Sequence, residues 1–313
     1  MTLSGICKVC GEDLKSQASL HKHLKKHKMD KPAYYEEYYP RLNKLTNKPI
    51  KFKNEDQYFF DDFENYKQMV DWLEVNGDQG KIYCASKFAQ RINLKDLKTA
   101  PSHVYCLLSD LPNPFIVKKY WGTYKEFCNY INLEQVFTQY ISVKELPAPE
   151  NATILIDTRE QKPLDFANSR VQKLHVGDYT LEGANHNNVF IERKSESDFK
   201  GTFTGGIDRF KNELQLAVDN DSYLVVLVES FIEKINKENG AFGNHPVNLT
   251  YLWHNVKEVL SQYSNNVQFV FSGNRAGSKF LLPRLLNLGD KIRKVDVQYF
   301  IDTERKTYEW LGM

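Results

Sequence analysis

The run VFIERKSESD at residues 189–198 decides how this chain is interpreted, together with LHVGDYTL at residues 174–181, in which Asp178 stands eleven residues before Val189. An acidic residue leading into one strand, followed by Glu-Arg-Lys at the end of the next, brings carboxylates and a lysine to one edge of a sheet. Hard divalent cations prefer carboxylate oxygens, and such a cation activates water and neutralises charge on a phosphodiester. The pattern therefore predicts a metal-dependent site that acts on phosphate esters of a polyanion.

Alternating strand-like and helix-like runs surround this pattern in residues 152–313. Short apolar runs at 153–157, 189–193, 223–229 and 267–271 predict buried strands, and apolar residues at helical spacing predict helices at 208–219, 249–263 and 278–294. This alternation predicts an α/β domain, with helices packed on a central sheet. Asp157 and Glu192 each close a strand-like run, which places both carboxylates where open α/β sheets carry their ligand sites.

Three segments precede this domain. Residues 1–32 are too few to fold around a hydrophobic core without a staple. Residues 33–143 are rich in aromatic and charged side chains and predict a mainly helical accessory or DNA-binding segment. The stretch KELPAPEN at 144–151 has two closely spaced prolines and predicts a linker.

The first segment contains metal ligands at a specific spacing. Cys7, Cys10, His23 and His27 follow the pattern C-x2-C-x12-H-x3-H, which predicts a tetrahedral Zn²⁺ site. Residues 5–28 resemble the Cys2His2 zinc-finger family, a small ββα fold, with Leu14 and Leu20 at its core positions.

Positive charge is concentrated in the same region. Residues 1–53 carry twelve lysines and arginines against five acids, a net charge of +7, whereas the whole chain carries only +2. Lys22, Lys25 and Lys26 are suited to phosphate contacts, and the serines at the base-reading positions, Ser16 and Ser19, discriminate poorly between bases. We expect the finger to bind DNA; a finger that contacts only protein is the alternative.

The blocks ILIDTRE (154–160), VGDYTL (176–181) and VFIERKSESDF (189–199) resemble, in order and spacing, the nuclease domain of the XPF family of structure-specific endonucleases. That family belongs to the PD-(D/E)xK superfamily, and the likeness extends through residues 152–295. The resemblance implies a restriction-endonuclease-like domain, a central mixed sheet flanked by helices, at 152–313. It also implies an Mg²⁺- or Mn²⁺-dependent endodeoxyribonuclease that cuts branched or flapped DNA, and a homodimer through the nuclease domain.

The resemblance assigns a role to each matched position. Asp178 is the central metal ligand, Glu192 is the second carboxylate, and Lys194 is the cation near the water and the scissile phosphate. Asp157 and Glu160 complete the metal shell directly or through water. Arg193 either touches phosphate or pairs with one of these acids. Arg209 could reach a DNA phosphate, although an ordinary arginine on a helix surface fits its position equally well.

Two other functions stay open at this point. One is a sequence-directed nuclease of the homing or restriction type, with the finger and the accessory segment reading a site. The other is a non-catalytic DNA-binding scaffold. Clustered acids facing a polyanion argue against the scaffold, because binding alone has no use for them.

Composition narrows the class of protein. No run approaches the ~20 apolar residues of a membrane span, and no N-terminal stretch resembles a signal peptide. Five cysteines, two of them in the zinc motif, do not form a disulfide framework. We therefore expect an intracellular protein without a membrane partner, in the cytoplasm or nucleoid. The fusion of a finger to an aromatic run resembles bacteriophage nucleases, for which the host cytoplasm is expected.

Overall fold

The computed structural model describes residues 5–53, 62–63, 66–94, 99–109, 111, 114–142, 145–183, 188–237, 241–242 and 245–304. The chain divides into two compact units, residues 1–95 and residues 96–313. The division does not coincide with the segments expected from the sequence, since residues 96–142 of the accessory segment fall in the second unit.

The first unit begins with a short hairpin and two helices. An isolated antiparallel bridge joins Ile6 to Asp13. The helical segments that follow are α1 (Gln17–His23), the 3-10 turn η1 (Leu24–His27) and α2 (Lys31–Tyr38). Asp30 caps α2 by accepting a hydrogen bond from the backbone N–H of Ala33.

Two tyrosines of α2 complete the small core of the hairpin and α1. Tyr34 and Tyr35 are fully buried beside Leu20 and Leu24. The Tyr34 hydroxyl accepts a hydrogen bond from the backbone N–H of Lys8 at 2.9 Å. The aromatic run that follows residue 32 is therefore part of the core of the finger-like segment, and α2 crosses the boundary expected at residues 32 and 33.

A longer helix in the described part of the first unit is α4 (Tyr66–Leu94), which is interrupted at Gly77. The backbone of Gly77 is at φ 51° and ψ −124°, outside the helical region, so two helical stretches meet there at a kink. Asp62 gathers positive charge beside this helix, because Arg41, Lys44 and Lys87 all form ion pairs with its carboxylate.

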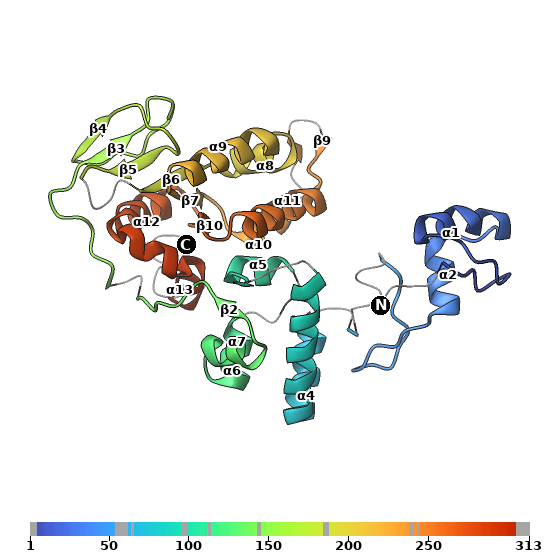
Figure 1. The fold of residues 1–313 in the computed structure, drawn as a ribbon. Helices are drawn as coiled ribbons and strands as arrows, with labels where there is room; N and C mark the ends of the chain where they lie inside the picture. The colour runs from blue at the N-terminus through green and yellow to red at the C-terminus, as the bar shows by residue number, and fades with distance from the viewer. Residues whose placement is uncertain are drawn as a thin grey trace. The chain divides into compact units, whose positions relative to one another are not determined.

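The second unit is built on a six-stranded mixed sheet in the order β10-β7-β6-β5-β3-β4 (Figure 1). Strands β6, β7 and β10 are mutually parallel, β5 runs antiparallel to both of its neighbours, and β4 is parallel to β3. The strands are β3 (Ile154–Ile156), β4 (Ser169–Val171), β5 (Tyr179–Leu181), β6 (Val189–Lys194), β7 (Tyr223–Val228) and β10 (Val267–Phe271).

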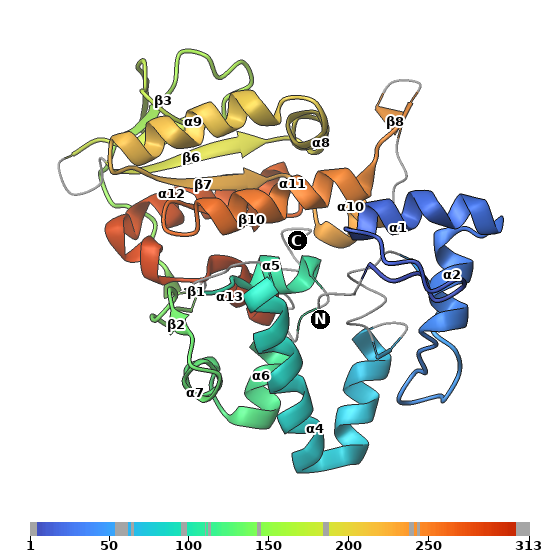
Figure 2. The same cartoon turned by 45° about the vertical axis from the view of Figure 1, so that its right-hand side comes forward.

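Helices cover both faces of this sheet, α8 and α9 on one face and α12 on the other (Figures 1 and 2). The other elements are α10 (Ile232–Lys237), α11 (Leu249–Gln262), α13 (Val297–Glu304), the 3-10 turn η3 (Gly289–Lys294) and the pair β8 (Ala241–Phe242) and β9 (His245–Pro246). Leucines of α12 (Arg275–Asn287) pack on β6 and β5, and phenylalanines of α8 (Glu196–Thr204) and α9 (Ile207–Asp219) pack on the opposite face. The expected fold, a central mixed sheet flanked by helices, is confirmed.

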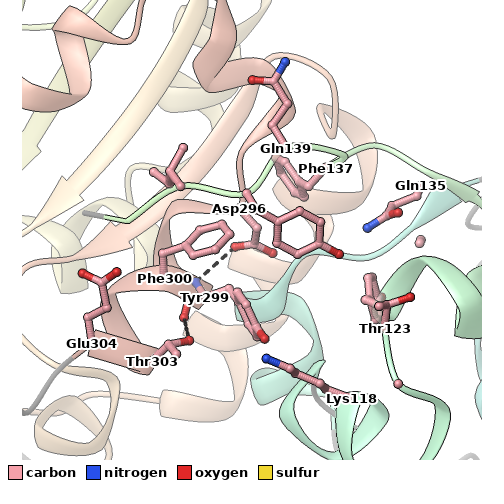
Figure 3. A pocket seen from close by; sticks show the side chains of 15 residues that line it. Lys118, Thr123, Gln135, Phe137, Gln139, Asp296, Tyr299, Phe300, Thr303 and Glu304 are labelled. Carbon is pink, nitrogen blue, oxygen red and sulfur yellow. Dashed lines mark hydrogen bonds between the residues drawn. The ribbon is translucent and has the colours of Figure 1, made fainter. Parts of the chain in front are cut away.

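Part of the accessory segment packs onto this sheet domain. It comprises β1 (Thr99–Ala100), α5 (His103–Leu108), α6 (Pro114–Trp121), α7 (Tyr124–Tyr130) and β2 (Glu134–Gln135). Helix α5 contacts α11 and α13, and the buried His103 lies 2.8 Å from Asp302. A pocket of about 360 Å³ lies between this segment and α13. Figure 3 shows Lys118, Thr123 and Gln135 on one side of it and Tyr299, Phe300 and Thr303 on the other.

The segment expected to be a linker contributes to the core of the second unit. Leu146 is buried with residues of β3 and α12, and the carbonyl of Pro147 accepts a hydrogen bond from Asn287 at 3.1 Å. Lys144 lies outside the described residues. None of the helices in the described part of the chain is long and apolar enough to cross a membrane.

Candidate active site and a cysteine–histidine cluster

Strand β6 presents its three charged residues on two faces, because side chains alternate along a strand. Glu192 and Lys194 share one face: Lys194 Nζ lies 2.9 Å from Glu192 Oε1 and 5.3 Å from the ring centre of Phe210 on α9. Arg193 points the other way, toward Glu160 and Glu229. The spacing Glu-Arg-Lys therefore places the carboxylate of Glu192 beside the ammonium of Lys194, and it directs the guanidinium of Arg193 to the other face of the strand.

A tight turn before β5 positions Asp178. Gly177 has φ +65°, and a Cβ there would lie 3.1 Å from the carbonyl oxygen of Ile191 and 3.2 Å from Phe190. Glycine is required because the turn is left-handed and runs close against β6. Asp178 then joins β6 through its backbone N–H to Ile191, and its Oδ2 accepts a hydrogen bond from the backbone N–H of Arg193.

Asp157, which directly follows β3, is only 1% exposed, and both of its carboxylate oxygens accept hydrogen bonds. Its Oδ1 accepts hydrogen bonds from the backbone N–H and the Nε of Arg159, and its Oδ2 accepts one from the backbone N–H of Leu174. Burial alone would raise the pKa of Asp157, but these hydrogen bonds lower it below its ordinary value. Of the six predicted catalytic residues, Asp157 is the one outside the lining of the cleft described below.

Glu160 and Arg193 form a buried pair with a third partner. The Nε and Nη2 of Arg193 donate to both carboxylate oxygens of Glu160 at 3.0–3.1 Å, and Nη1 lies 3.0 Å from Glu229 Oε1. The side chains of Arg193 and Glu160 are 8% and 6% exposed. Burial disfavours the charge on Arg193, but the two carboxylates raise its pKa above the ordinary value.

Five of the six predicted catalytic residues line one cleft of about 550 Å³. It also contains the predicted DNA contact Arg209, which is exposed on α9, and Asp198 at the start of α8. The predicted members are Glu160, Asp178, Glu192, Arg193 and Lys194.

Sequence reasoning missed one further acid in this cleft. Glu213 on α9 lines it, and Glu213 Oε1 accepts a hydrogen bond from the backbone N–H of Gly177 at 3.2 Å. It stands 21 residues beyond Glu192, on a separate element. Its position one helical turn after Arg209 is the signal that could have found it, since residues four apart share a helix face.

Carboxylates crowd the centre of the cleft and alter one another's titration. Burial, and then the charge of Glu192, raise the pKa of Asp178 to about 8. Burial also raises the pKa of Glu192, with Glu213 adding to the rise and Lys194 opposing it. The carboxyl groups of Asp178 and Glu192 therefore hold a proton more readily than exposed carboxyl groups do, chiefly because burial disfavours their charged forms.

The four predicted zinc ligands converge in the first unit. The ligand atoms of Cys7, Cys10, His23 and His27 all lie within 4.8 Å of one another, an arrangement that could hold a metal ion. The Nε2 atoms of His23 and His27 are 2.9 Å apart, and Cys10 Sγ lies 3.2 Å from His23 Nε2. On its other side, His23 Nδ1 lies 3.5 Å from a carboxylate oxygen of Glu12.

The predicted base-reading serines are occupied within their own helix. Ser16 caps α1, and its Oγ accepts the backbone N–H of Ser19 and lies 2.9 Å from the Ser19 hydroxyl. Lys22, Lys25 and Lys26, in contrast, are exposed on α1 and η1. The segment therefore presents cations to solvent and uses its hydroxyls for capping.

Residues 156–278 match the family model of the ERCC4 domain, and the range includes all six predicted catalytic residues. The predicted XPF-type resemblance is confirmed for these residues. Similar solved structures include XPF from Aeropyrum pernix, with 15% identity, a TM-score of 0.33 and coverage of 45% of this chain and 68% of that chain. Another is XPF from Aeropyrum pernix in complex with DNA, with 16% identity, a TM-score of 0.35 and coverage of 52% and 82%. No curated protein matches the chain.

Proposed function

We propose that the ERCC4 domain formed by residues 156–278 makes this chain a DNA endonuclease that depends on Mg²⁺ or Mn²⁺ and cuts branched or flapped DNA. The observation that carries the proposal is the cleft in which Asp178, Glu192 and Lys194 meet. We propose four functional parts, a finger at 1–32, an accessory segment at 33–143, a linker at 144–151 and the nuclease domain at 152–313, although Tyr34 and Tyr35 pack in the core of the first part and Leu146 in that of the last.

The donor set of the cleft fits a hard divalent cation. Asp178 and Glu192 supply oxygen donors, which Mg²⁺ and Mn²⁺ prefer. Both oxygens of Asp157 and both oxygens of Glu160 already accept hydrogen bonds, so we propose that Asp157 positions Arg159 and the turn at Leu174, and that Glu160 positions Arg193.

A divalent cation, when bound, neutralises charge on the scissile phosphate and makes water a stronger nucleophile. Lys194 has the position to hold the attacking water or a non-bridging phosphate oxygen, since its ammonium is fixed beside Glu192 and Phe210. Arg209 is exposed at the rim and can hold a neighbouring phosphate. In-line attack of water on phosphorus would leave a 5′-phosphate and a 3′-hydroxyl.

Of its two expected roles, we assign Arg193 that of pairing with the acids. Its guanidinium pairs with Glu160 and Glu229, so it holds these carboxylates in place rather than facing the phosphate.

For the cysteine–histidine cluster we propose Zn²⁺. Two thiolates and two imidazoles within 4.8 Å are the donor set of tetrahedral structural zinc sites, and Glu12 next to His23 Nδ1 is a typical outer carboxylate. The exposed lysines at 22, 25 and 26 then bind DNA phosphates without reading sequence. Atomic emission analysis of the purified protein tests the metal: one zinc per chain is expected, and none in a Cys7→Ser/Cys10→Ser variant.

A cleavage panel tests the activity. Labelled flap, fork, four-way junction and linear duplex DNA are incubated with the full chain and Mg²⁺, Mn²⁺ or neither. Asp178→Asn should lower the rate by at least about a hundredfold, because a bound cation supplies several kcal/mol of transition-state stabilisation. If wild type and Asp178→Asn give the same products, or neither gives any, on every substrate, the proposal is wrong.

The same panel separates the other candidates. Discrete fragments from linear duplex would indicate a sequence-directed nuclease, which the use of Ser16 and Ser19 in helix capping disfavours. DNA binding without cleavage would indicate a scaffold. Dimerisation through the nuclease domain is proposed from the resemblance, and sedimentation of the full chain with and without DNA tests it. As expected from the sequence, we also propose that the protein acts inside a cell, in the cytoplasm or nucleoid.

A further inference from the structure

We infer that Glu213 is a third carboxylate of the cation centre and supplies a ligand beside Asp178 and Glu192. The inference rests on the proposed function and names a residue outside the three sequence blocks that define the site. It makes the centre depend on helix α9 as well as on the sheet.

The position of Glu213 follows from the amphipathic pattern of α9. Ile207, Phe210, Leu214 and Ala217 are the buried residues of this helix and face the sheet. Glu213 precedes Leu214 and so lies at the edge of the buried stripe, from which its side chain reaches the cleft. Its Oε1 accepts the backbone N–H of Gly177, the residue before Asp178. This hydrogen bond ties the Glu213 carboxylate to the backbone one residue before Asp178.

The pairing of charges distinguishes Glu213 from the other acids in the cleft. Glu160 pairs with Arg193, and Glu192 pairs with Lys194. Asp178 and Glu213 each accept one backbone N–H, from Arg193 and from Gly177. Within the described part of the chain, neither forms an ion pair, and Asp178 Oδ1 and Glu213 Oε2 have no hydrogen-bond donor.

Two carboxylate oxygens without a donor, in the same cleft as Glu192, are ligands of the kind that a hard cation prefers, and such a cation takes six or more oxygen ligands. Arg159 also lines the cleft, but its Nε donates to Asp157. Within the described residues, no side chain forms an ion pair with Glu213 or with Asp178. In the competing explanation, Glu213 only repels the DNA backbone. A neutral variant would then bind DNA more tightly and bind Mn²⁺ as well as the wild type does.

The experiment measures Mn²⁺ binding to the zinc-loaded full chain by electron paramagnetic resonance, with cleavage assayed separately. Glu213→Gln keeps an oxygen that can accept the N–H of Gly177 but removes the charge. Asp208→Asn removes a charge from the exposed first turn of the same helix and serves as the control. Glu213→Gln is expected to weaken Mn²⁺ binding about tenfold or more, and Asp208→Asn to leave it unchanged.

The Mn²⁺ concentration that gives half-maximal cleavage should rise by the same factor. Unchanged Mn²⁺ binding by Glu213→Gln, with or without tighter DNA binding, overturns the inference. If thermal unfolding shows that Glu213→Gln disturbs the fold, Glu213→Asp decides: retained affinity in this charged variant supports ligation, and affinity as weak as that of Glu213→Gln contradicts it. Asp178→Asn separates the two proposals, because unchanged Mn²⁺ binding by that variant would refute the cation centre itself.

Discussion

The buried arginine between two carboxylates makes a quantitative prediction about stability. Removing one partner of a buried ion pair costs about 3–5 kcal/mol, because it leaves charge without compensation. Arg193→Ala would leave Glu160 and Glu229 facing each other at side-chain exposures of 6% and 10%. For a domain of about 150–250 residues, 1 kcal/mol shifts Tm by about 2–4 °C, so the expected fall in Tm is about 6–20 °C.

Differential scanning calorimetry of the full chain, in buffer without magnesium or manganese, measures this change. Arg170→Ala is the matched control, because Arg170 and Glu182 form a pair at 2.6 Å that is 54% and 44% exposed. An exposed pair contributes at most about 1 kcal/mol, so this control should lower Tm by less than about 4 °C.

A second variant tests the cause of the loss. Arg193→Met combined with Glu160→Gln and Glu229→Gln removes the cation and both anions together. If uncompensated charge is the cause, this combination recovers most of the lost Tm. A fall of less than about 4 °C for Arg193→Ala, or a combined variant no more stable than Arg193→Ala, refutes the reasoning.

Three further predictions follow from other parts of the molecule. Replacing Lys22, Lys25 and Lys26 together by alanine should weaken binding to all DNA sequences alike and reduce the slope of log affinity against log salt by about 2–3, as titrations at several salt concentrations would reveal. An unchanged slope would remove these lysines from the DNA contact. Gly177→Ala should destabilise the protein by about 1–3 kcal/mol in urea unfolding, because the φ angle of Gly177 is +65° and an added Cβ would lie close to the carbonyl oxygen of Ile191. As a control, Gly205→Ala should change stability by less than about 1 kcal/mol, because the nearest contact of an added Cβ there is at 3.8 Å. Equal effects of the two glycine variants would contradict this assignment. In buffer whose only divalent cation is zinc, the pKa of Asp178 in the folded chain is about 8, above its ordinary value of 3.8. Between these two values the folded state binds a proton that the unfolded state releases, so the free energy of unfolding falls as the pH rises. Urea unfolding across this pH range should show that fall in wild type and a smaller one in Asp178→Asn; identical slopes would show that Asp178 does not titrate in this way.

Local sequence determined the elements that carry the chemistry. The run at 267–271 predicts a strand with the bounds of β10, and the runs at 189–193 and 223–229 predict β6 and β7 to within a residue. Buried strands are legible because each is a short continuous apolar run between polar segments. The spacing of Cys7, Cys10, His23 and His27 likewise predicts their convergence, since a hairpin and one helical face are local structures.

The roles within the site depended on packing between distant segments. Alternation along β6 predicts that Arg193 leaves the face of Glu192, but only the fold brings Glu160 and Glu229 to meet its guanidinium. The burial of Tyr34 and Tyr35 was also not predictable from the local sequence, because their run resembles the other aromatic stretches of the accessory segment.

By itself the sequence determined the α/β class, the strand that carries Glu192 and Lys194, and the convergence of Cys7, Cys10, His23 and His27, because each depends on residues close together along the chain. Only the tertiary structure decided which acids share the cleft. It buried Asp157 against Arg159 and Leu174, and it brought Glu213 from α9 to the peptide before Asp178. The physical reason is that the role of a carboxylate depends on the hydrogen-bond donors and charges around it. These come from elements far apart in the sequence, and no local sequence pattern predicts that they pack together.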